Sequence, residues 1–301
     1  MIRSGKGLIV MVLCIVFGAN RTEAQSLDSQ LKNGMILIYQ QHFQQADSLL
    51  VALEKQHPAS IQVHLLGVNL YWHKWVMGDH QDALQKRFYN ELDVVRTLLK
   101  QAQKTGKVTH EHTYSWINYY GFLARMDGIQ KHYWRAFQNI RACVHHLQTS
   151  FGLEGHYEPF RLSTGIYHLY ASNASSRYPL LRPYLNTLPA HRKEQGMHYL
   201  EQACRSSDPV VSAEAHYFLM KWNLDEGHPE NALPLATQLC NTYPGNSLFR
   251  FYRMQAQLAL KQTDAAERDR QKLLVVLSTN PELNAYQKKH LADLVKKDLH
   301  K

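Results

Sequence analysis

The chain has 301 residues, 45% of them hydrophobic and 20% charged, with 15 Gly and 10 Pro. This is the composition of a globular protein with a sizeable core, and it excludes a disordered, collagen-like or low-complexity chain. The formal net charge is +9, and the 18 His can add positive charge as the pH falls, so anionic partners are allowed but not required.

The first residues have the pattern of a secretory signal peptide. Arg3 and Lys6 precede a short apolar run, and small residues ending at Ala24 offer a cleavage site. The run is shorter than the ~20 apolar residues that span a bilayer, and no later stretch is apolar enough to do so. We expect residues 1–24 to be a signal peptide and residues 25–301 to form one exported domain, periplasmic or secreted, without a membrane span. An N-terminal anchor that is never cleaved is the alternative.

The rest of the chain has the pattern of helices. Apolar residues recur at helical spacing almost throughout. No stretch of alternating β-branched residues is closed by Asn-Gly or Asp-Gly, the usual hairpin turns. We therefore expect an all-α protein, in which an internal repeat is the next feature to test.

Small and apolar residues recur with a period of about 34 residues. Counting from Leu27 places Gly34 at position eight, Ala46 at position twenty and Pro58 at position thirty-two. Small residues at positions eight and twenty let two antiparallel helices approach closely, and the apolar positions then pack against the next pair. This pattern predicts a first helix pair between Leu27 and Pro58.

The same count fits later segments. From Tyr114 it puts Gly128 at position fifteen, where the chain should break between the two helices of a pair. From Ala213 it puts Gly227 at position fifteen and Ala232 at position twenty, which is the clearest match. With the weaker matches included we expect about six pairs, and the later ones begin at Ile61, Tyr114, Pro159, Ala213 and Leu248.

Residues 172–190 interrupt the fourth pair, after a first helix expected at residues 159–171. Three prolines within this segment forbid a long regular helix. We expect an irregular insertion between the two helices of the pair. It is either a contact region for a partner or a packed connector.

The end of the chain predicts one further helix. Asn280 fits the N-cap and Pro281 the first helical position. Leu283 and Leu291 belong to an apolar stripe, and the lysines fall largely elsewhere. We expect a polar-faced helix that caps the solenoid.

These residues closely resemble the tetratricopeptide repeat superfamily over nearly the whole chain after residue 24. The part from Phe160 to Leu274 is similar to exported tetratricopeptide proteins of bacterial envelopes, through Gly165-Ile166-Tyr167, Gly196-Met197 and Tyr243-Pro244-Gly245-Asn246. The resemblance implies a right-handed α-α superhelix that holds protein partners and has no catalytic residues.

The resemblance also implies that the first helix of each pair lines a concave groove. The candidate groove residues are Asn69, Trp72, His73, Asn118, Phe122, Arg125, Ile166, Tyr170, Tyr217 and Lys221. Aromatic rings together with amides and cations suit an extended peptide or a sugar chain. The alternative for single members, such as Trp72, Phe122 and Ile166, is that they pack in the core.

Motifs for other chemistry are absent from the sequence. It has no zinc-protease pair of histidines, no Gly-x-Ser-x-Gly elbow and no phosphate-binding glycine loop. We expect His110 and His112, and likewise His145 and His146, to lie at the surface, because a helix points such close neighbours apart. Lys and Arg are spread among acidic residues, so we expect no nucleic acid. We also expect no catalytic residue, no metal and no cofactor.

The cysteines Cys143, Cys204 and Cys240 are expected to be small packed residues. Cys204 and Cys240 occupy equivalent positions on neighbouring second helices, which lie about 8–10 Å apart in stacked pairs. That separation exceeds what a disulfide tolerates. We predict no disulfide between them.

The sequence supports two functions. The first is a non-enzymatic, exported scaffold that binds a protein or peptide in the cell envelope. The alternative is a glycan-binding protein or a helical-toroid glycoside hydrolase, which the 17 Tyr and 5 Trp favour. A hydrolase needs two opposed carboxylates about 5–10 Å apart, and the candidates are Glu154, Glu158, Glu194 and Glu214.

Overall fold

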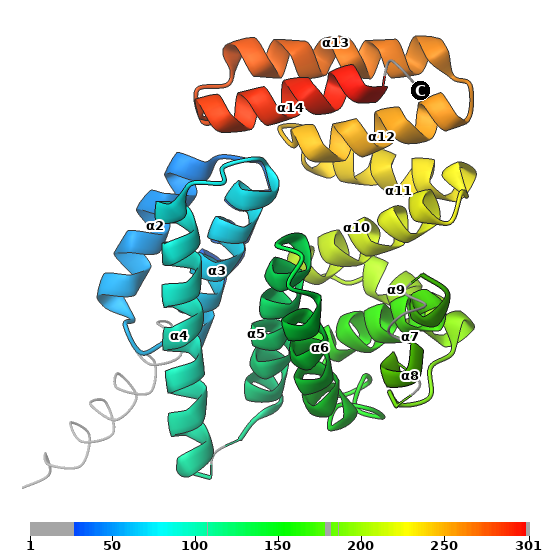
Figure 1. The fold of residues 1–301 in the computed structure, drawn as a ribbon. Coiled ribbons are helices and arrows are strands. Elements are labelled where there is room, and N and C mark those ends of the chain that lie inside the picture. Colours follow the sequence, from blue (N-terminus) through cyan, green and yellow to red (C-terminus); the bar gives the residue numbers. More distant parts are fainter. Residues whose placement is uncertain (1–26, 107, 178–181, 186, 299–301) are drawn as a thin grey trace, which may run out of the picture.

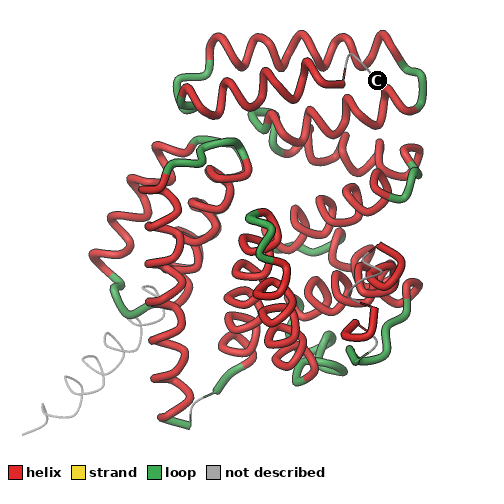
Figure 2. The backbone as a smooth tube through the Cα atoms, viewed as in Figure 1, coloured by secondary structure: helices red, strands yellow, loops and turns green. Residues whose placement is uncertain are grey.

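The computed structural model describes residues 27–106, 108–177, 182–185 and 187–298. The predicted signal peptide lies outside these residues. Within them the chain is helical, with short connecting loops and no strand (Figure 2). In the same part of the chain, no helix combines the length and the hydropathy that a membrane span requires.

The helices pack as consecutive antiparallel pairs, which makes the protein an α-α solenoid (Figure 1). The pairs are residues 27–39 with α2 (Phe43–Gln56), α3 (Ile61–Val76) with α4 (Asp82–Lys104), α5 (His110–Ile129) with α6 (Tyr133–Gln148), α7 (Pro159–Arg177) with α9 (Lys193–Cys204), α10 (Pro209–Asp225) with α11 (Pro229–Thr242), and α12 (Ser247–Ala259) with α13 (Thr263–Thr279). The short α8 (Arg182–Leu185) lies between α7 and α9, and α14 (Ala285–Asp298) ends the array. The predicted all-α fold, with about six pairs and a final capping helix, is confirmed.

Small residues set the helix spacing, as the repeat pattern predicts. Ala46 and Ala232, at position twenty of their units, are 2% and 0% exposed. A Cβ atom added to Gly34 would lie 2.7 Å from Leu66 Cδ2 on α3, so this glycine lets the first pair approach the second. The 34-residue period therefore marks real packing positions in these units.

The same turn joins the two helices in five of the pairs. The second residue after the first helix, just past the C-cap, has a positive φ and closes a Schellman turn. The next backbone N–H donates to a carbonyl five residues earlier. The five turn residues are Gln41 (φ 60°), Gly78 (96°), Lys131 (61°), Gly227 (78°) and Lys261 (60°). Gly227 is where the repeat predicts it. The predicted break at Gly128 is wrong, because Gly128 lies inside α5 and the turn comes three residues later.

Two helix boundaries differ from the sequence predictions. The first helix of the fourth pair runs to Arg177 and so includes the start of the expected insertion. The last helix begins at Ala285, because Asn284 Oδ1 accepts from Gln287 N at 3.0 Å and acts as the cap. Asn280 instead ends α13, where its side chain accepts from Glu282 N at 2.8 Å. The predicted apolar stripe is confirmed, since Leu283 and Leu291 are 3% and 0% exposed.

The array closes on itself. Asn246 Nδ2 donates to the Tyr39 carbonyl at 2.7 Å, and Gln41 Oε1 accepts from Ser247 Oγ at 2.7 Å. Gln41, Asn246 and Ser247 are 2%, 4% and 0% exposed, so these bonds are shielded from water. The first pair is therefore held directly against the start of the sixth pair.

A second set of contacts joins the N-terminal pairs to the end of the chain. Asn284 Nδ2 donates to Asp79 Oδ2 at 2.7 Å, and Gln44 N donates to Glu282 Oε2 at 2.7 Å. Helices α2 to α4 accordingly lie beside α12 and α14 in Figure 1. The pairs form a ring, and their first helices face its centre.

Candidate functional site

A cavity of about 830 Å³ lies inside the ring. Its walls come from residues 27–39 and from α3, α5, α7 and α10, the first helices of the first five pairs, with α6 and the segment around α8 on one side. The volume falls within the range of about 300–1,000 Å³ that is usual for ligand sites. The concave surface of the array is therefore a ligand-sized cavity.

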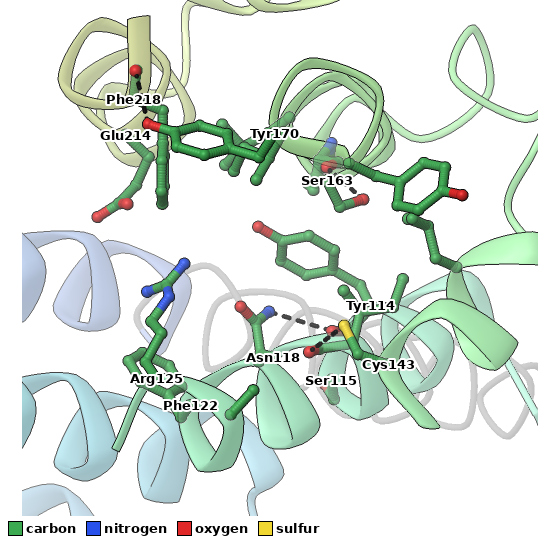
Figure 3. A pocket seen from close by; sticks show the side chains of 18 of the residues that line it. Tyr114, Ser115, Asn118, Phe122, Arg125, Cys143, Ser163, Tyr170, Glu214 and Phe218 are labelled. Carbon is green, nitrogen blue, oxygen red and sulfur yellow. Dashed lines mark hydrogen bonds between the residues drawn. The ribbon is translucent and has the colours of Figure 1, made fainter. Parts of the chain in front are cut away.

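One wall of the cavity is a single face of α5. Tyr114, Asn118, Phe122 and Arg125 lie three or four residues apart, which places them on one side of the helix (Figure 3). The Tyr114 ring reaches into the cavity, and Asn118 Nδ2 donates to the Tyr114 carbonyl at 3.1 Å. This face offers aromatic surface, an amide and a cation in one row.

The opposite wall comes from α7 and α10. The hydroxyl of Tyr170 donates to the Phe218 carbonyl at 3.1 Å, and its ring lies edge-on to Phe218, with 6.0 Å between ring centroids. Trp222 packs against the same Tyr170 ring at 5.3 Å. Tyr170, Phe218 and Trp222 all line the cavity, so this wall is largely aromatic.

Glu214 is the carboxylate on the α10 wall. Tyr39, on the helix of residues 27–39, donates a hydrogen bond from its hydroxyl to Glu214 Oε1 at 2.7 Å. Burial and the charge of Glu214 hold the pKa of Tyr39 well above its ordinary range, so the phenol stays protonated and remains a donor. The ring closure therefore fixes the position of a cavity side chain.

Arg125 is the cation on the α5 wall. Its guanidinium lies between two rings, 5.3 Å from the centroid of Phe122 and 5.1 Å from that of Phe218. Within the described part of the chain it has no hydrogen-bond acceptor and no ion-pair partner. Arg125 and Glu214 lie on facing walls, as Figure 3 shows. The guanidinium is thus held in place with its donors available to a ligand.

Two further cavity side chains are kept neutral by burial. Desolvation raises the pKa of Tyr114 well above its ordinary range, and it raises the pKa of the Cys143 thiol to about 11. Cys143 Sγ also donates to the Ile117 carbonyl at 3.4 Å. A protonated thiol in this setting packs against its neighbours and is a poor nucleophile.

Six of the ten candidate groove residues line the cavity. They are Asn69, Asn118, Phe122, Arg125, Ile166 and Tyr170. Phe122 is also only 5% exposed, so it belongs to the core and to the wall at once.

The other four candidates lie beside the cavity and pack against neighbouring helices. Trp72 contacts Phe122 at 6.0 Å between ring centroids, and His73 contacts Tyr39 at 5.7 Å. Tyr217 packs on Phe249 of α12 at 6.2 Å, and the Lys221 ammonium lies 4.7 Å from the ring of Tyr252. Each of these four side chains is therefore covered by a residue of a neighbouring helix pair.

The sequence did not single out Tyr114, Phe218 or Trp222 as groove residues. Tyr114 stands one turn before Asn118 on the same face, and Phe218 is one turn after Glu214. Extending the predicted face of α5 by four residues would have found Tyr114. On α10 the predicted positions Tyr217 and Lys221 are each one residue before Phe218 and Trp222, so the predicted face is one residue out of register.

The four carboxylates considered for a hydrolase are dispersed. Glu214 lines the cavity, whereas Glu154, Glu158 and Glu194 do not. Glu154 is 5% exposed in the core beneath α7. No pair from this set faces one cleft.

The cysteines are free, with Cys240 buried and Cys143 and Cys204 partly buried. The predicted absence of a bond between Cys204 and Cys240 is therefore confirmed.

The histidine pairs do not share one environment. His112 is part of the cap at the start of α5, where it bonds Thr109, while His146 stacks on Trp116 with 5.2 Å between centroids.

Comparison with protein-family models, curated proteins and solved structures finds no match for this chain. Fold and cavity define it as a helical-repeat protein whose pairs close around a ligand-sized central cavity.

Proposed function

We propose that the protein is a non-enzymatic binding protein that holds a peptide segment of a partner in its central cavity. The observation that supports this most strongly is the position of Arg125. Its guanidinium lies between two phenylalanine rings, and its N–H donors point into an aromatic cavity. An arginine that lacks a protein acceptor is suited to a carboxylate, which it binds with two parallel hydrogen bonds.

A peptide matches the other walls as well. Phe218 and Tyr170 can contact apolar side chains, and Asn69 and Asn118 place amides where peptide groups need partners. Glu214 faces Arg125, so the cavity carries both charges and suits a ligand that does the same. A peptide carboxylate at Arg125 with a cationic or N–H group towards Glu214 satisfies both walls.

Sequence features support the kind of partner and the cellular location in this proposal. The resemblance to tetratricopeptide proteins favours a protein partner, and the N-terminal pattern favours export to the cell envelope. The glycan alternative shares the aromatic walls, but the dispersed glutamates count against hydrolysis. A neutral sugar offers Arg125 hydroxyl acceptors but no carboxylate for two parallel charge-assisted hydrogen bonds.

The test is a selection from a random peptide library displayed with free carboxyl termini, followed by calorimetry on the selected peptides. We expect peptides that bind the wild type to lose at least tenfold in affinity with Arg125→Gln, and again with Phe218→Ala, because both changes remove central contacts. Arg96→Gln is the matched control, since Arg96 is exposed on α4 and pairs with Asp93 at 2.9 Å, outside the cavity lining.

Circular dichroism shows whether each variant keeps its helices. A folded Arg125→Gln variant that binds the selected peptides as tightly as the wild type would refute the proposal. So would selected peptides whose binding depends equally on Arg96.

A further inference from the structure

A group of metal-ligating side chains lies away from the cavity, where three consecutive helices meet. Glu54 stands near the end of α2, His64 near the start of α3 and Glu91 in the middle of α4. One nitrogen or oxygen atom from each side chain lies within 4.8 Å of the other two. None of the three lines the cavity, so this group is separate from the proposed peptide site.

The hydrogen bonds of His64 define which ring nitrogen faces the group. Nε2 lies 3.0 Å from the Pro58 carbonyl oxygen, which can only accept, so Nε2 carries a proton. A backbone carbonyl on the far nitrogen is the usual partner of a histidine that binds metal through its other nitrogen. Nδ1 lies 2.7 Å from Glu91 Oε2. Burial disfavours a charge on His64, but the hydrogen bonds to Glu91 and Pro58 and the charges of Glu91 and Glu54 raise its pKa overall, so a second proton on Nδ1 can meet the carboxylate. A metal ion at this place would replace that proton on Nδ1.

Glu91 is paired with His64, whereas Glu54 forms no ion pair within the described residues. Glu54 Oε1 is fully shielded from solvent and accepts no hydrogen bond. The side chains of His64 and Glu91 are only 10% and 14% exposed. Arg87 is near enough to affect Glu54 electrostatically, but within the described residues it forms no ion pair with either glutamate. Two acidic groups and an imidazole thus converge in a poorly hydrated space, where either a proton on His64 or a bound cation offsets the negative charge.

The lack of a side chain at Gly67 leaves room for Glu91 in this position. A Cβ atom on Gly67 would lie 3.1 Å from both Cγ and Cδ of Glu91, so the glutamate side chain lies flat on α3. Any larger residue at position 67 would push the carboxylate away from His64. Glu91 therefore lies close to His64 because its side chain is packed against the backbone of α3.

We propose that Glu54, His64 and Glu91 bind one divalent transition-metal ion, with zinc as the test ion, and that the ion fastens the first helix pair to the second. One imidazole and two carboxylates form a donor set for such ions. Tetrahedral zinc ligands lie about 3.3 Å apart, given bond lengths of about 2.0–2.2 Å. Small rotations of the two glutamates meet that spacing and leave a fourth position for water.

Sequence reasoning could not find this group. Its members come from three helices. His64 follows Glu54 by ten positions, and Glu91 follows His64 by twenty-seven. Metal motifs in sequence depend on ligands that share one helix face or one short loop. Only the packing of α2, α3 and α4 brings these side chains together.

The experiment is a zinc titration of the full chain after treatment with EDTA, in competition with a chromophoric chelator. We expect one equivalent of zinc to bind the wild type, and the affinity to fall at least tenfold in His64→Gln and in Glu91→Gln. The matched controls are His228→Gln and Glu230→Gln. This exposed pair has one nitrogen and one carboxylate oxygen 3.4 Å apart and lacks the third ligand. We expect both controls to bind zinc as the wild type does.

X-ray absorption at the zinc edge of the loaded wild type keeps the test independent of variant folding. We expect a first shell of one imidazole nitrogen with oxygen ligands. Absence of stoichiometric zinc, wild-type affinity in a folded His64→Gln variant, or a shell of several imidazoles would each overturn the proposal. None of these outcomes bears on peptide binding at Arg125, so the two proposals fail separately.

Discussion

A single buried histidine couples the stability of the fold to pH. His168, on α7, is 7% exposed and stacks on Phe151 with 5.7 Å between ring centroids. Within the described residues its Nδ1 has no hydrogen-bond partner. Burial lowers the pKa of His168 below its ordinary value; Glu154 opposes that shift, and the charges of His191 and Arg192 add to it. The folded protein therefore favours the neutral ring.

The sign of the pH effect follows from this lowered pKa. At a pH below about 6.5 the unfolded chain binds a proton at His168 that the folded chain resists, so the free energy of unfolding falls as the pH falls. We expect His168→Gln to reduce the loss of stability between pH 7.5 and 5.5, by at most about 1.4 kcal/mol per pH unit. Urea unfolding at each pH measures it. The same slope in His168→Gln as in the wild type, or an equal reduction in the exposed control His156→Gln, would contradict the assignment.

Between elements, α7 and α9 cross with their backbones in close contact. A Cβ atom on Gly196 would lie 2.6 Å from Leu169 N and 2.9 Å from the Gly165 oxygen, both in the backbone of α7. A Cβ on Gly165 would instead meet the side chain of Leu200 at 2.8 Å, which can move more easily. The fourth pair thus has no room for any side chain at Gly196.

Gly196→Ala should therefore separate two helices. We expect it to lower the free energy of unfolding by about 2 kcal/mol or more, because overpacking of a tight contact costs about 1–3 kcal/mol and here no side chain can yield. Gly121→Ala is the control, since a Cβ at this position on α5 meets nothing within 4 Å. It should raise the free energy of unfolding by about 0.5–1 kcal/mol through helix propensity. Chemical denaturation checks both; equal effects of the two changes would refute the argument.

The elements were the part that the sequence predicted well. A 34-residue spacing of small residues identified the pairs, because buried small residues such as Gly34, Ala46 and Ala232 recur where helices pack, although Gly121 of the third pair meets no neighbour within 4 Å. It failed at Gly128 because the turn tolerates Lys131 with a positive φ, so glycine does not mark every turn. It failed at the last helix because Asn280 and Asn284 are both good caps, and tertiary contacts of Asn284 with Asp79 favour the second. Local propensity cannot choose between such alternatives.

The candidate site was predictable only in part, because its shape depends on how the first and last pairs of the whole molecule meet. Repeat position identified Asn118, Phe122 and Arg125, since these depend on the face of one helix. It could not foresee that the ring closes, because the closing contacts join residues about 205 positions apart, such as Gln41 and Ser247. Closure turns an open groove into a cavity.

Ring closure can be tested by a substitution that replaces a single side-chain NH2 group with an oxygen atom. Asn246 Oδ1 caps α12 by accepting from Phe249 N at 2.9 Å, while its Nδ2 donates to the Tyr39 carbonyl at 2.7 Å. Asn246→Asp keeps the cap, because Asp and Asn serve equally as N-caps, but it replaces the closing donor with an oxygen that repels the Tyr39 carbonyl. Leaving a buried carbonyl unpaired costs about 1–3 kcal/mol, so we expect a loss of about 2 kcal/mol or more in the free energy of unfolding.

The same change should alter shape as well as stability. We expect small-angle X-ray scattering to show a larger radius of gyration for Asn246→Asp with an unchanged helical circular dichroism spectrum. Amide hydrogen exchange should accelerate around residues 39–44 and 243–249, whose contacts close the ring, and not in α5 and α6. Thr109→Asp, at the exposed cap of α5, is the control and should change neither shape nor exchange at those segments. If Asn246→Asp matched this control, the closing contacts would not hold the ring, and the cavity would owe its shape to the stacking of consecutive pairs alone.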